Sequence, residues 1–252
     1  MAELKALIFD VDGTLADTER DGHRVAFNKA FADAGLDWDW SVETYGRLLA
    51  VTGGKERIRF FIDDFLEHFD APADLDGFIA DLHKRKTARY LDMLKAGQIP
   101  LRPGVKHLLD EARAAGVTLA IATTTTPENV TCLLESTLGP GSVDWFAVIG
   151  AGDVVPAKKP AADIYFYVME HLGLGPEACV AFEDSHNGIR ATNDAALRTI
   201  VAVNGYTRDE DFDGAALVLS DFGEPDRPFE VLAGDAHGRR CVDLELARAV
   251  LG

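Results

Sequence analysis

The stretch Lys5-Ala-Leu-Ile-Phe-Asp-Val-Asp-Gly-Thr-Leu15 decides the fold of this chain. Its apolar run, Ala6 to Phe9, predicts a short buried strand of a parallel sheet, and two acids follow directly. Residues i and i+2 of a strand point to the same side, so we expect Asp10 and Asp12 to face one site. The two carboxylates repel each other, and Mg²⁺, which prefers hard oxygen ligands, would relieve that repulsion.

The turn after these acids also carries groups that suit phosphate chemistry. Gly13 lets the backbone turn sharply, and Thr14 offers a hydroxyl to an anion. For Asp10 to Thr14 taken alone, the alternative is an acidic turn after an ordinary strand. The remainder of the chain favours a functional site.

The composition limits the classes of protein to which the chain can belong. Its 252 residues, 47% of them hydrophobic, are enough for a large domain or for a core with a smaller unit. The formal net charge of -17 makes nucleic acid and anionic membranes poor partners. The three cysteines have no metal-ligand or disulfide spacing, and no segment has the length of a signal-peptide core or a membrane span. We therefore expect a cytoplasmic protein; its oligomeric state is left open, with a monomer as the expectation.

From residue 101 onward, apolar runs typical of strands alternate with helical patterns. This βαβ pattern predicts a doubly wound parallel α/β sheet, a Rossmann-like core. Further strands are predicted over Val117 to Ala122, Trp145 to Ile149, Cys179 to Phe182 and Thr199 to Val203, and helices over Val105 to Ala115, from Pro127, and over Ala161 to Leu172. The carboxyl ends of such strands border the crevice in which doubly wound sheets bind ligands.

Residues 17–97 follow a different pattern and predict an inserted helical domain. Helical patterns run over Glu19 to Ala34, Glu56 to Phe69 and Leu75 to Leu94, without a convincing strand. The core is then residues 1–16 with 98–252, and two short connections would permit hinge motion. We interpret the insertion as a cap, and we assign no chemistry to the tail, residues 206–252.

Three further polar clusters follow predicted strands and would complete one site. The run Thr123-Thr124-Thr125-Thr126 supplies hydroxyls and turn amides for phosphate oxygens. Lys159 could neutralise both a phosphate and Asp10, and Glu183-Asp184 places carboxylates where a cation would need ligands. The alternatives are an exposed threonine loop, a solvated surface lysine, and helix capping by Asp184 or Ser185.

Together these motifs resemble, in order and spacing, the four motifs of the haloacid dehalogenase superfamily; they are Phe9-Asp10-Val11-Asp12-Gly13-Thr14, Thr123, Lys159-Pro160 and Glu183-Asp184. The resemblance implies that family's α/β core, an inserted α-helical C1-type cap and a Mg²⁺ cofactor. It implies that Asp10 is the nucleophile that forms an aspartyl phosphate and that Asp12 is the general acid and base. It also implies that Thr123 and Lys159 bind the transferring phosphoryl group. The metal ligands that it implies are Asp10, Asp12 through its backbone carbonyl, Asp184 and, as the less direct member, Glu183.

Asp12 narrows the expected activity, because true haloacid dehalogenases lack an acid at this position. Its presence implies phosphoryl transfer rather than cleavage of a carbon–halogen bond. More closely, the chain resembles the CbbY-type branch, which is similar to β-phosphoglucomutase and dephosphorylates xylulose-1,5-bisphosphate, an inhibitor of Rubisco. That resemblance implies hydrolysis of the 1-phosphate of this small sugar bisphosphate, giving xylulose-5-phosphate and phosphate.

The cap supplies most of the substrate-binding residues that the resemblance implies. The segment Thr52-Gly53-Gly54-Lys55 combines backbone amides with a cation before a helical pattern, as a second phosphate would require. Glu19 and Tyr45 are expected to contact sugar hydroxyls, and Lys55 and Arg85 the distal phosphate. His23 and Lys84 align with residues that β-phosphoglucomutase uses. The full predicted set is Thr14, Glu19, His23, Tyr45, Gly53, Gly54, Lys55, Lys84, Arg85 and Thr124, and a solvated helix face is the alternative for the charged members.

Three other functions remain open from the sequence. They are a β-phosphoglucomutase-like phosphotransferase, a phosphoglycolate-type phosphatase and a catalytically silent binding protein. Thr14 and the threonine run favour a phosphatase over the mutase, and the Gly53-Gly54-Lys55 segment favours a bisphosphate over phosphoglycolate. The intact core motifs disfavour a silent protein.

Overall fold

The computed structural model describes residues 3–51 and 53–252, so that Thr52 of the predicted cap motif lies outside the described residues. The chain divides into two compact units, Met1–Asp17 with Ile99–Gly252 and Thr18–Gln98. Each junction falls one residue later than the boundary predicted from the sequence. The first unit is called the core here and the second the helical unit.

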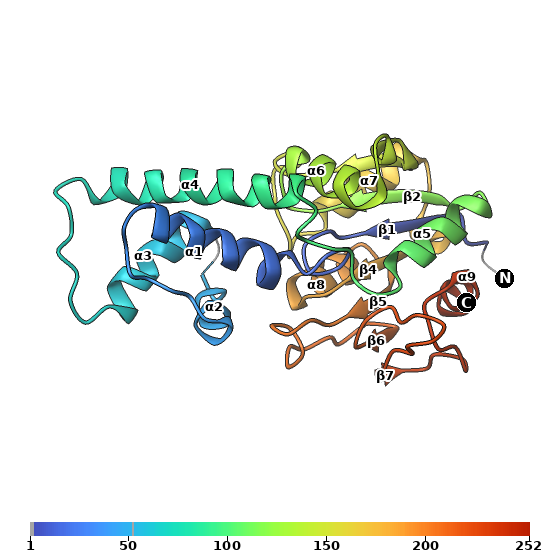
Figure 1. The fold of residues 1–252 in the computed structure, drawn as a ribbon. Helices are drawn as coiled ribbons and strands as arrows, with labels where there is room; N and C mark the ends of the chain where they lie inside the picture. The colour runs from blue at the N-terminus through green and yellow to red at the C-terminus, as the bar shows by residue number, and fades with distance from the viewer. Residues whose placement is uncertain (1–2, 52) are drawn as a thin grey trace. The chain divides into compact units, whose positions relative to one another are not determined.

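The core is built on a seven-stranded sheet in the order β3-β2-β1-β4-β5-β6-β7, which places β1 between β2 and β4 (Figure 1). All neighbouring strands are parallel except β6 and β7, which pair antiparallel. This confirms the α/β fold class. The strands are β1 (Ala6–Phe9), β2 (Thr118–Ala122), β3 (Phe146–Gly150), β4 (Cys179–Glu183), β5 (Arg198–Ala202), β6 (Leu217–Leu219) and β7 (Val231–Gly234).

Alternation of side chains along the strands explains why both faces of the sheet are covered. Ala6 and Ile8 of β1 belong to a buried cluster that includes side chains of α7 (Asp163–Leu172) and α8 (His186–Asp194). Phe9 points to the other face and stacks on Phe182 of β4, with ring centroids 4.7 Å apart. The helices α5 (Val105–Ala114) and α9 (Leu244–Leu251) pack against the sheet and each other, and α6 spans Pro127–Leu138.

The described residues of the helical unit form a π-helical turn and four helices. The turn spans Thr18–His23, and the helices are α1 (Arg24–Asp33), α2 (Val42–Leu48), α3 (Gly54–Phe65) and α4 (Leu75–Lys95). Helix α4 runs beside α1 (Figure 1). An aromatic cluster joins α1 to α3; its members are Phe27 and Phe31 of α1, Trp38 and Trp40 of the loop after α1, and Phe61 of α3. Among the described residues, no helix is both long and apolar enough to cross a bilayer.

Several elements differ from the sequence expectation. The stretch predicted as one helix from Glu19 begins as a π-helix containing Gly22, a residue with low helix propensity. Helix α3 ends at Phe65 rather than Phe69, since Phe69 packs from a loop against Trp38, with centroids 5.3 Å apart. The sequence patterns did not predict α2, α8, β6, β7 or α9, which are short or have weak periodicity.

Candidate active site

Lys159 connects the carboxyl ends of three neighbouring strands. Its Nζ donates to Asp10 Oδ1 at 2.7 Å, to Glu183 Oε1 at 2.7 Å and to the carbonyl of Ala122 at 2.8 Å. Only 7% of the Lys159 side chain is exposed. Burial alone would lower the pKa of Lys159, but the carboxylates of Asp10 and Glu183 overcome this effect and raise the pKa above its usual value. The ammonium therefore stays charged beside the predicted nucleophile.

Three buried carboxylates lie together at this end of the sheet. Each of Asp10, Glu183 and Asp184 offers an oxygen, and these oxygens all lie within 4.8 Å of one another. Burial raises the pKa of Asp184 well above its usual range, and the charges of Asp10 and Glu183 raise it further. One lysine cannot neutralise three such groups. The hard oxygen donors and the excess of negative charge fit a divalent cation.

Two neighbours that the sequence analysis missed hold Glu183 in place. The hydroxyl of Tyr165, a fully buried residue of α7, donates to Glu183 Oε1. Gly188 of α8 approaches from the other direction: a Cβ there would lie 1.9 Å from Glu183 Oε2, so that only glycine fits. Tyr165 lies in the apolar pattern of α7, so the sequence predicts only a core residue there. Nothing in the local sequence shows where its hydroxyl points.

Asp184 is held by the turn that follows β1 and by the segment that follows β5. Asn204 Nδ2 donates to Asp184 Oδ2 at 2.6 Å. Gly13 has a φ of +89°, and a Cβ on it would lie 2.1 Å from the same oxygen. Gly13 is thus required both by its backbone conformation and by its contact with Asp184. Asp12 is half-buried and lies outside the group of three close carboxylates.

Two threonine hydroxyls near these acids are suited to an anion. The Oγ1 of Thr14 is buried and has no hydrogen-bond partner among the described residues. Such an unpaired group is costly unless a ligand binds it. Thr123 is 1% exposed, and its Oγ1 accepts a hydrogen bond from the amide of Thr125 at 3.3 Å. Its hydroxyl hydrogen can therefore be donated elsewhere, whereas Thr124 is exposed.

In the helical unit, the lysine that contacts His23 is Lys86. Lys86 Nζ lies 3.0 Å from His23 Nδ1, and the His23 ring packs on Tyr90 with centroids 4.0 Å apart. Lys86 is only 9% exposed. By contrast, Lys84 and Arg85 are exposed, and Arg85 pairs with Asp81 at 2.7 Å. The structure therefore brings His23 together with Lys86 and leaves Lys84 exposed.

Glu19 and Tyr45 do come together, and Arg57 joins them. Tyr45 Oη donates to Glu19 Oε2 at 2.5 Å, and Arg57 Nη1 donates to Tyr45 Oη at 2.7 Å. Arg57 Nη1 also lies 3.8 Å from Glu19 Oε2, and 11% of the Arg57 side chain is exposed. Arg57 lies two residues after Lys55 in a short run of cations. This run indicated that Arg57 is a candidate binding residue.

The Gly53-Gly54-Lys55 segment starts α3, as a phosphate-binding role would require. Gly53 has a φ of +100°, and a Cβ on Gly54 would lie 2.5 Å from the ring of His83. The Glu56 carboxylate lies close to Gly53, where a Cβ would be 2.2 Å from its Oε2. Lys55 itself is exposed.

We expect the protein to lose stability in mild acid because of His23. Burial lowers the pKa of His23 well below its usual value, and the charges of Lys86, Arg57 and His83 lower it further. Below about pH 6.5 the unfolded chain then binds more protons than the folded chain, so this contribution to stability is complete above that pH and is lost as the pH falls. Urea unfolding at pH 7.5 and 5.5 measures the effect.

The pH experiment has two matched variants. His23→Gln should lose less stability than the wild type between the two pH values, because glutamine does not titrate. His171→Gln, at an exposed histidine of α7, should behave as the wild type does. Equal pH dependence in all three proteins would contradict the role assigned to His23.

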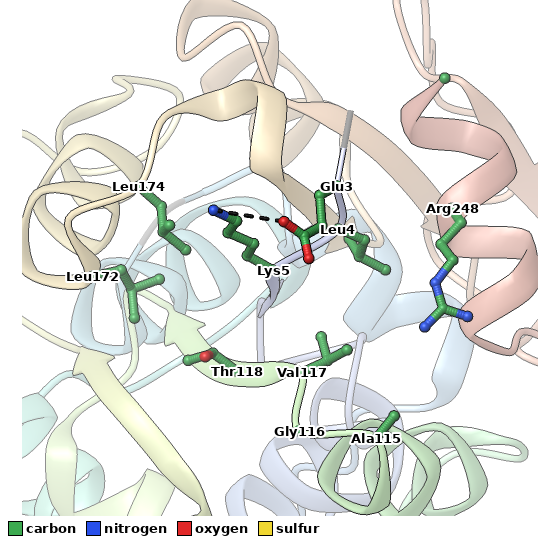
Figure 2. Close-up of a pocket in the computed structure, with 11 residues that line it drawn as sticks. Glu3, Leu4, Lys5, Ala115, Gly116, Val117, Thr118, Leu172, Leu174 and Arg248 are labelled. Carbon is green, nitrogen blue, oxygen red and sulfur yellow. Dashed lines mark ion pairs between the residues drawn. The ribbon is translucent and has the colours of Figure 1, made fainter. Parts of the chain in front are cut away.

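A separate cavity lies at the amino ends of β1 and β2 (Figure 2). Its volume is about 900 Å³, and its lining includes Lys5, Thr118, Leu174 and Arg248. Lys5 pairs there with Glu3 at 3.8 Å. None of the predicted site residues is among those that line this cavity, so it is distinct from the acidic group at the carboxyl ends of the strands.

An aspartate directly after the first strand of a doubly wound sheet, with a lysine and further acids at neighbouring strand ends, is the arrangement that one class of hydrolases shares. The profile described as haloacid dehalogenase-like hydrolase matches residues 4–196, and the chain belongs to this family. Within the family, the chain is a homologue of CbbY. The protein CbbY of Rhodobacter capsulatus is 51% identical over 219 residues, which cover 87% of this chain and 94% of that protein.

Further relatives agree with this placement. The plasmid-encoded CbbY of Cupriavidus necator is 45% identical over 98% of this chain and 96% of its own length. CbbY from Rhodobacter sphaeroides has been solved in complex with phosphate, and a mutant of it in complex with xylulose-1,5-bisphosphate. Each of these structures has a TM-score of 0.74 and 47% identity and covers 86% of this chain and 94% of the other.

Proposed function

We propose that this protein is a Mg²⁺-dependent phosphatase that hydrolyses the 1-phosphate of xylulose-1,5-bisphosphate to give xylulose-5-phosphate and phosphate. The observation that carries the proposal is the similarity to CbbY from Rhodobacter sphaeroides, which is 47% identical to this chain. A mutant of that protein was solved in complex with xylulose-1,5-bisphosphate. The buried group of Asp10, Glu183 and Asp184 with Lys159 supports phosphoryl transfer at the core.

The proposed mechanism starts with Asp10. Its carboxylate, held at Oδ1 by Lys159, attacks the phosphorus, and the bond from phosphorus to the sugar oxygen breaks. Asp12 gives its proton to the departing oxygen. A water molecule then attacks the aspartyl phosphate, Asp12 takes a proton from that water, and phosphate leaves with Asp10 regenerated. Lys159, Thr123 and Thr14 offset charge on the phosphoryl oxygens.

We propose Mg²⁺ as the cation that the acidic group holds. Asp10, Asp184 and Glu183 would supply carboxylate ligands, and the backbone carbonyl of Asp12 another. When bound, the ion would neutralise charge on the phosphoryl group.

The helical unit is proposed to select the substrate. Glu19, Tyr45 and Arg57 form a network of hydrogen bonds that can present a fixed set of donors and acceptors to sugar hydroxyls. The His23–Lys86 pair offers a further buried cation in this unit. Lys55 keeps its proposed role at the distal phosphate.

Replacing Lys55 by Ala is expected to raise KM for xylulose-1,5-bisphosphate by about tenfold with little change in kcat, because an anchoring charge pair near the surface is lost. KM for xylulose-1-phosphate, which lacks the distal phosphate, should not change. Lys95→Ala, at an exposed lysine of α4 in the same unit, is the control. An equal loss with both substrates, or the same loss in the control, would remove the distal role of Lys55.

Phosphate release across a substrate panel tests the proposed function. Release would be measured with and without Mg²⁺ for xylulose-1,5-bisphosphate, ribulose-1,5-bisphosphate, phosphoglycolate and β-glucose-1-phosphate, with glucose-6-phosphate followed in parallel. Selective release from xylulose-1,5-bisphosphate is expected. Glucose-6-phosphate formation would instead assign a mutase, and preference for phosphoglycolate would assign the corresponding phosphatase.

A further inference from the structure

Arg102 makes a set of contacts that neither the sequence motifs nor the proposed mechanism uses. Its guanidinium donates to four backbone carbonyls of the core. Nη1 reaches Gly13 and, at 2.7 Å, Ala202; Nη2 reaches Val203 at 2.5 Å and Ser220 at 3.1 Å. An arginine has a planar fork of five N–H donors, so a single side chain can bind several carbonyls in fixed directions.

The four carbonyls belong to three segments that follow strands at the catalytic end of the sheet. Gly13 lies in the turn after β1, next to Asp12. Ala202 is the last residue of β5, and Val203 follows it. Ser220 directly follows β6. The backbone of Arg102 also binds the turn after β1, since its amide donates to the carbonyl of Leu15 at 2.8 Å. Arg102 therefore holds these turns together, and the most distant of them, at Ser220, lies 118 residues from Arg102 in the chain.

Two of the clamped segments carry the groups that place Asp184. Val203 precedes Asn204, which donates to Asp184 Oδ2 at 2.6 Å. Gly13 packs against the same pair: a Cβ on it would lie 2.1 Å from Asp184 Oδ2 and 2.8 Å from Asn204 Nδ2. A shift of either carbonyl would consequently move Asp12, Asp184 or both.

Arg102 also brings a buried positive charge to an acidic region. Burial lowers its pKa below the usual value, while Asp184, Asp17 and Asp221 act in the opposite direction. In the described contacts the guanidinium donates to backbone carbonyls and not to the Asp184 carboxylate.

We propose that Arg102 is a positioning residue for phosphoryl transfer, which holds the turn bearing Asp12 and the segment bearing Asn204 in one fixed arrangement. It does not touch the reacting atoms. Its effect is exerted through the geometry of Asp12, which moves the proton, and of Asp184, which holds the cation. The inference rests on the proposed function for the roles of those two acids.

The test compares Arg102→Lys and Arg102→Gln with the wild type. Neither side chain can reproduce the four-carbonyl fork, and lysine retains the charge. We expect kcat to fall by about 10²-fold in both variants, as for a catalytic group displaced by about 1 Å, with KM changed less than about twofold. The Mg²⁺ concentration for half-maximal activity should rise. The lysine variant covers the case in which the glutamine variant does not fold.

A spectroscopic measurement separates positioning from mere stability. Fluoroberyllate binds an aspartate carboxylate as a mimic of the phosphoryl group, and its ¹⁹F spectrum reports the groups around it without a substrate. Altered ¹⁹F shifts in folded Arg102→Lys are expected. Arg198→Lys is the matched control, because Arg198 also binds a backbone carbonyl, that of Val250 at 3.0 Å, but at the amino end of β5.

The outcomes are distinct for the two proposals. Wild-type kcat, Mg²⁺ dependence and ¹⁹F shifts in folded Arg102→Lys, or changes no larger than in Arg198→Lys, would overturn the positioning role. A wild-type protein that binds fluoroberyllate but leaves every sugar phosphate intact would overturn the proposed substrate, and the ¹⁹F shifts would still decide the role of Arg102.

Discussion

Replacing Asp10 by Asn is expected to reduce phosphate release by at least about 10⁴-fold, because an amide cannot form the acyl phosphate on which the reaction depends. Asp10 lies directly after β1, is 6% exposed and receives a hydrogen bond from Lys159. The measurement is the initial rate with xylulose-1,5-bisphosphate at saturating Mg²⁺. Rapid-quench detection of protein-bound phosphate would show the aspartyl phosphate in the wild type and none in the variant.

The same substitution should leave the protein folded. Asparagine has nearly the same shape, and Lys159 keeps its bonds to Glu183 Oε1 and to the Ala122 carbonyl. Urea unfolding of the variant is the control for a loss of fold. Turnover above one part in about 10³ of the wild-type rate in a folded Asp10→Asn protein would rule out Asp10 as the nucleophile.

Replacing Lys159 by Met is expected to lower both activity and stability. The change removes the Lys159 ammonium, which bridges Asp10 and Glu183, and leaves those buried carboxylates facing each other. Breaking a buried ion pair in this way costs about 3 kcal/mol of unfolding free energy. Activity should fall by about 10²- to 10³-fold, because the charge that stabilises the transferring phosphoryl group is lost.

The stability loss in Lys159→Met should depend on pH and on Mg²⁺. Burial raises the pKa values of Glu183 and Asp184, so these acids take up protons as the pH falls towards those raised values, and their repulsion is relieved. The deficit relative to the wild type is therefore largest at neutral pH and shrinks in acid. Added Mg²⁺ should also reduce it. Urea unfolding at pH 7.5 and 5, with and without Mg²⁺, measures both effects.

The neighbouring lysine provides a control in the same loop. Lys158 pairs with Asp153 at 2.8 Å, and 53% of its side chain is exposed. Lys158→Met should change neither activity nor stability by more than a small amount, because exposed ion pairs contribute little. If both lysine variants behaved alike, the bridge from Lys159 to Asp10 and Glu183 would not be the source of the effect.

The sequence by itself was enough to predict the core and the group of residues at the carboxyl ends of its strands. Strands such as Ala6–Phe9 and Cys179–Glu183 are short apolar runs whose burial in a parallel sheet follows from their composition. Parallel strands also end at one edge, so the residues that follow them, Asp10, Thr123 and Glu183-Asp184, were expected to converge. The geometry confirms that Asp10, Glu183, Asp184 and Lys159 meet; the catalytic roles assigned to them remain predictions.

In the helical unit, the sequence did not show which charged side chains are buried. Four consecutive residues, His83 to Lys86, include three cations, and only the rotation of α4 decides which of them is buried beside His23. A helix turns by about 100° per residue, so an error of one or two positions exchanges the buried face for the exposed one. The packing of α4 on α1 buries Lys86 against the Phe27 and Tyr90 rings and leaves Lys84 and Arg85 outside.

The contacts that hold the acidic side chains and turns of the site in place could not be predicted from the sequence. Tyr165, Asn204 and Arg102 look like a core aromatic, a turn residue and a surface cation when they are read locally. Their partners, Glu183, Asp184 and the carbonyl of Gly13, lie from 18 to 89 residues away. Strand composition determined the sheet and the convergence of acids at its edge, because burial and strand direction are local properties. Which donor meets which oxygen was decided only by the tertiary structure, because a hydrogen bond depends on the relative placement of segments that are distant in the chain.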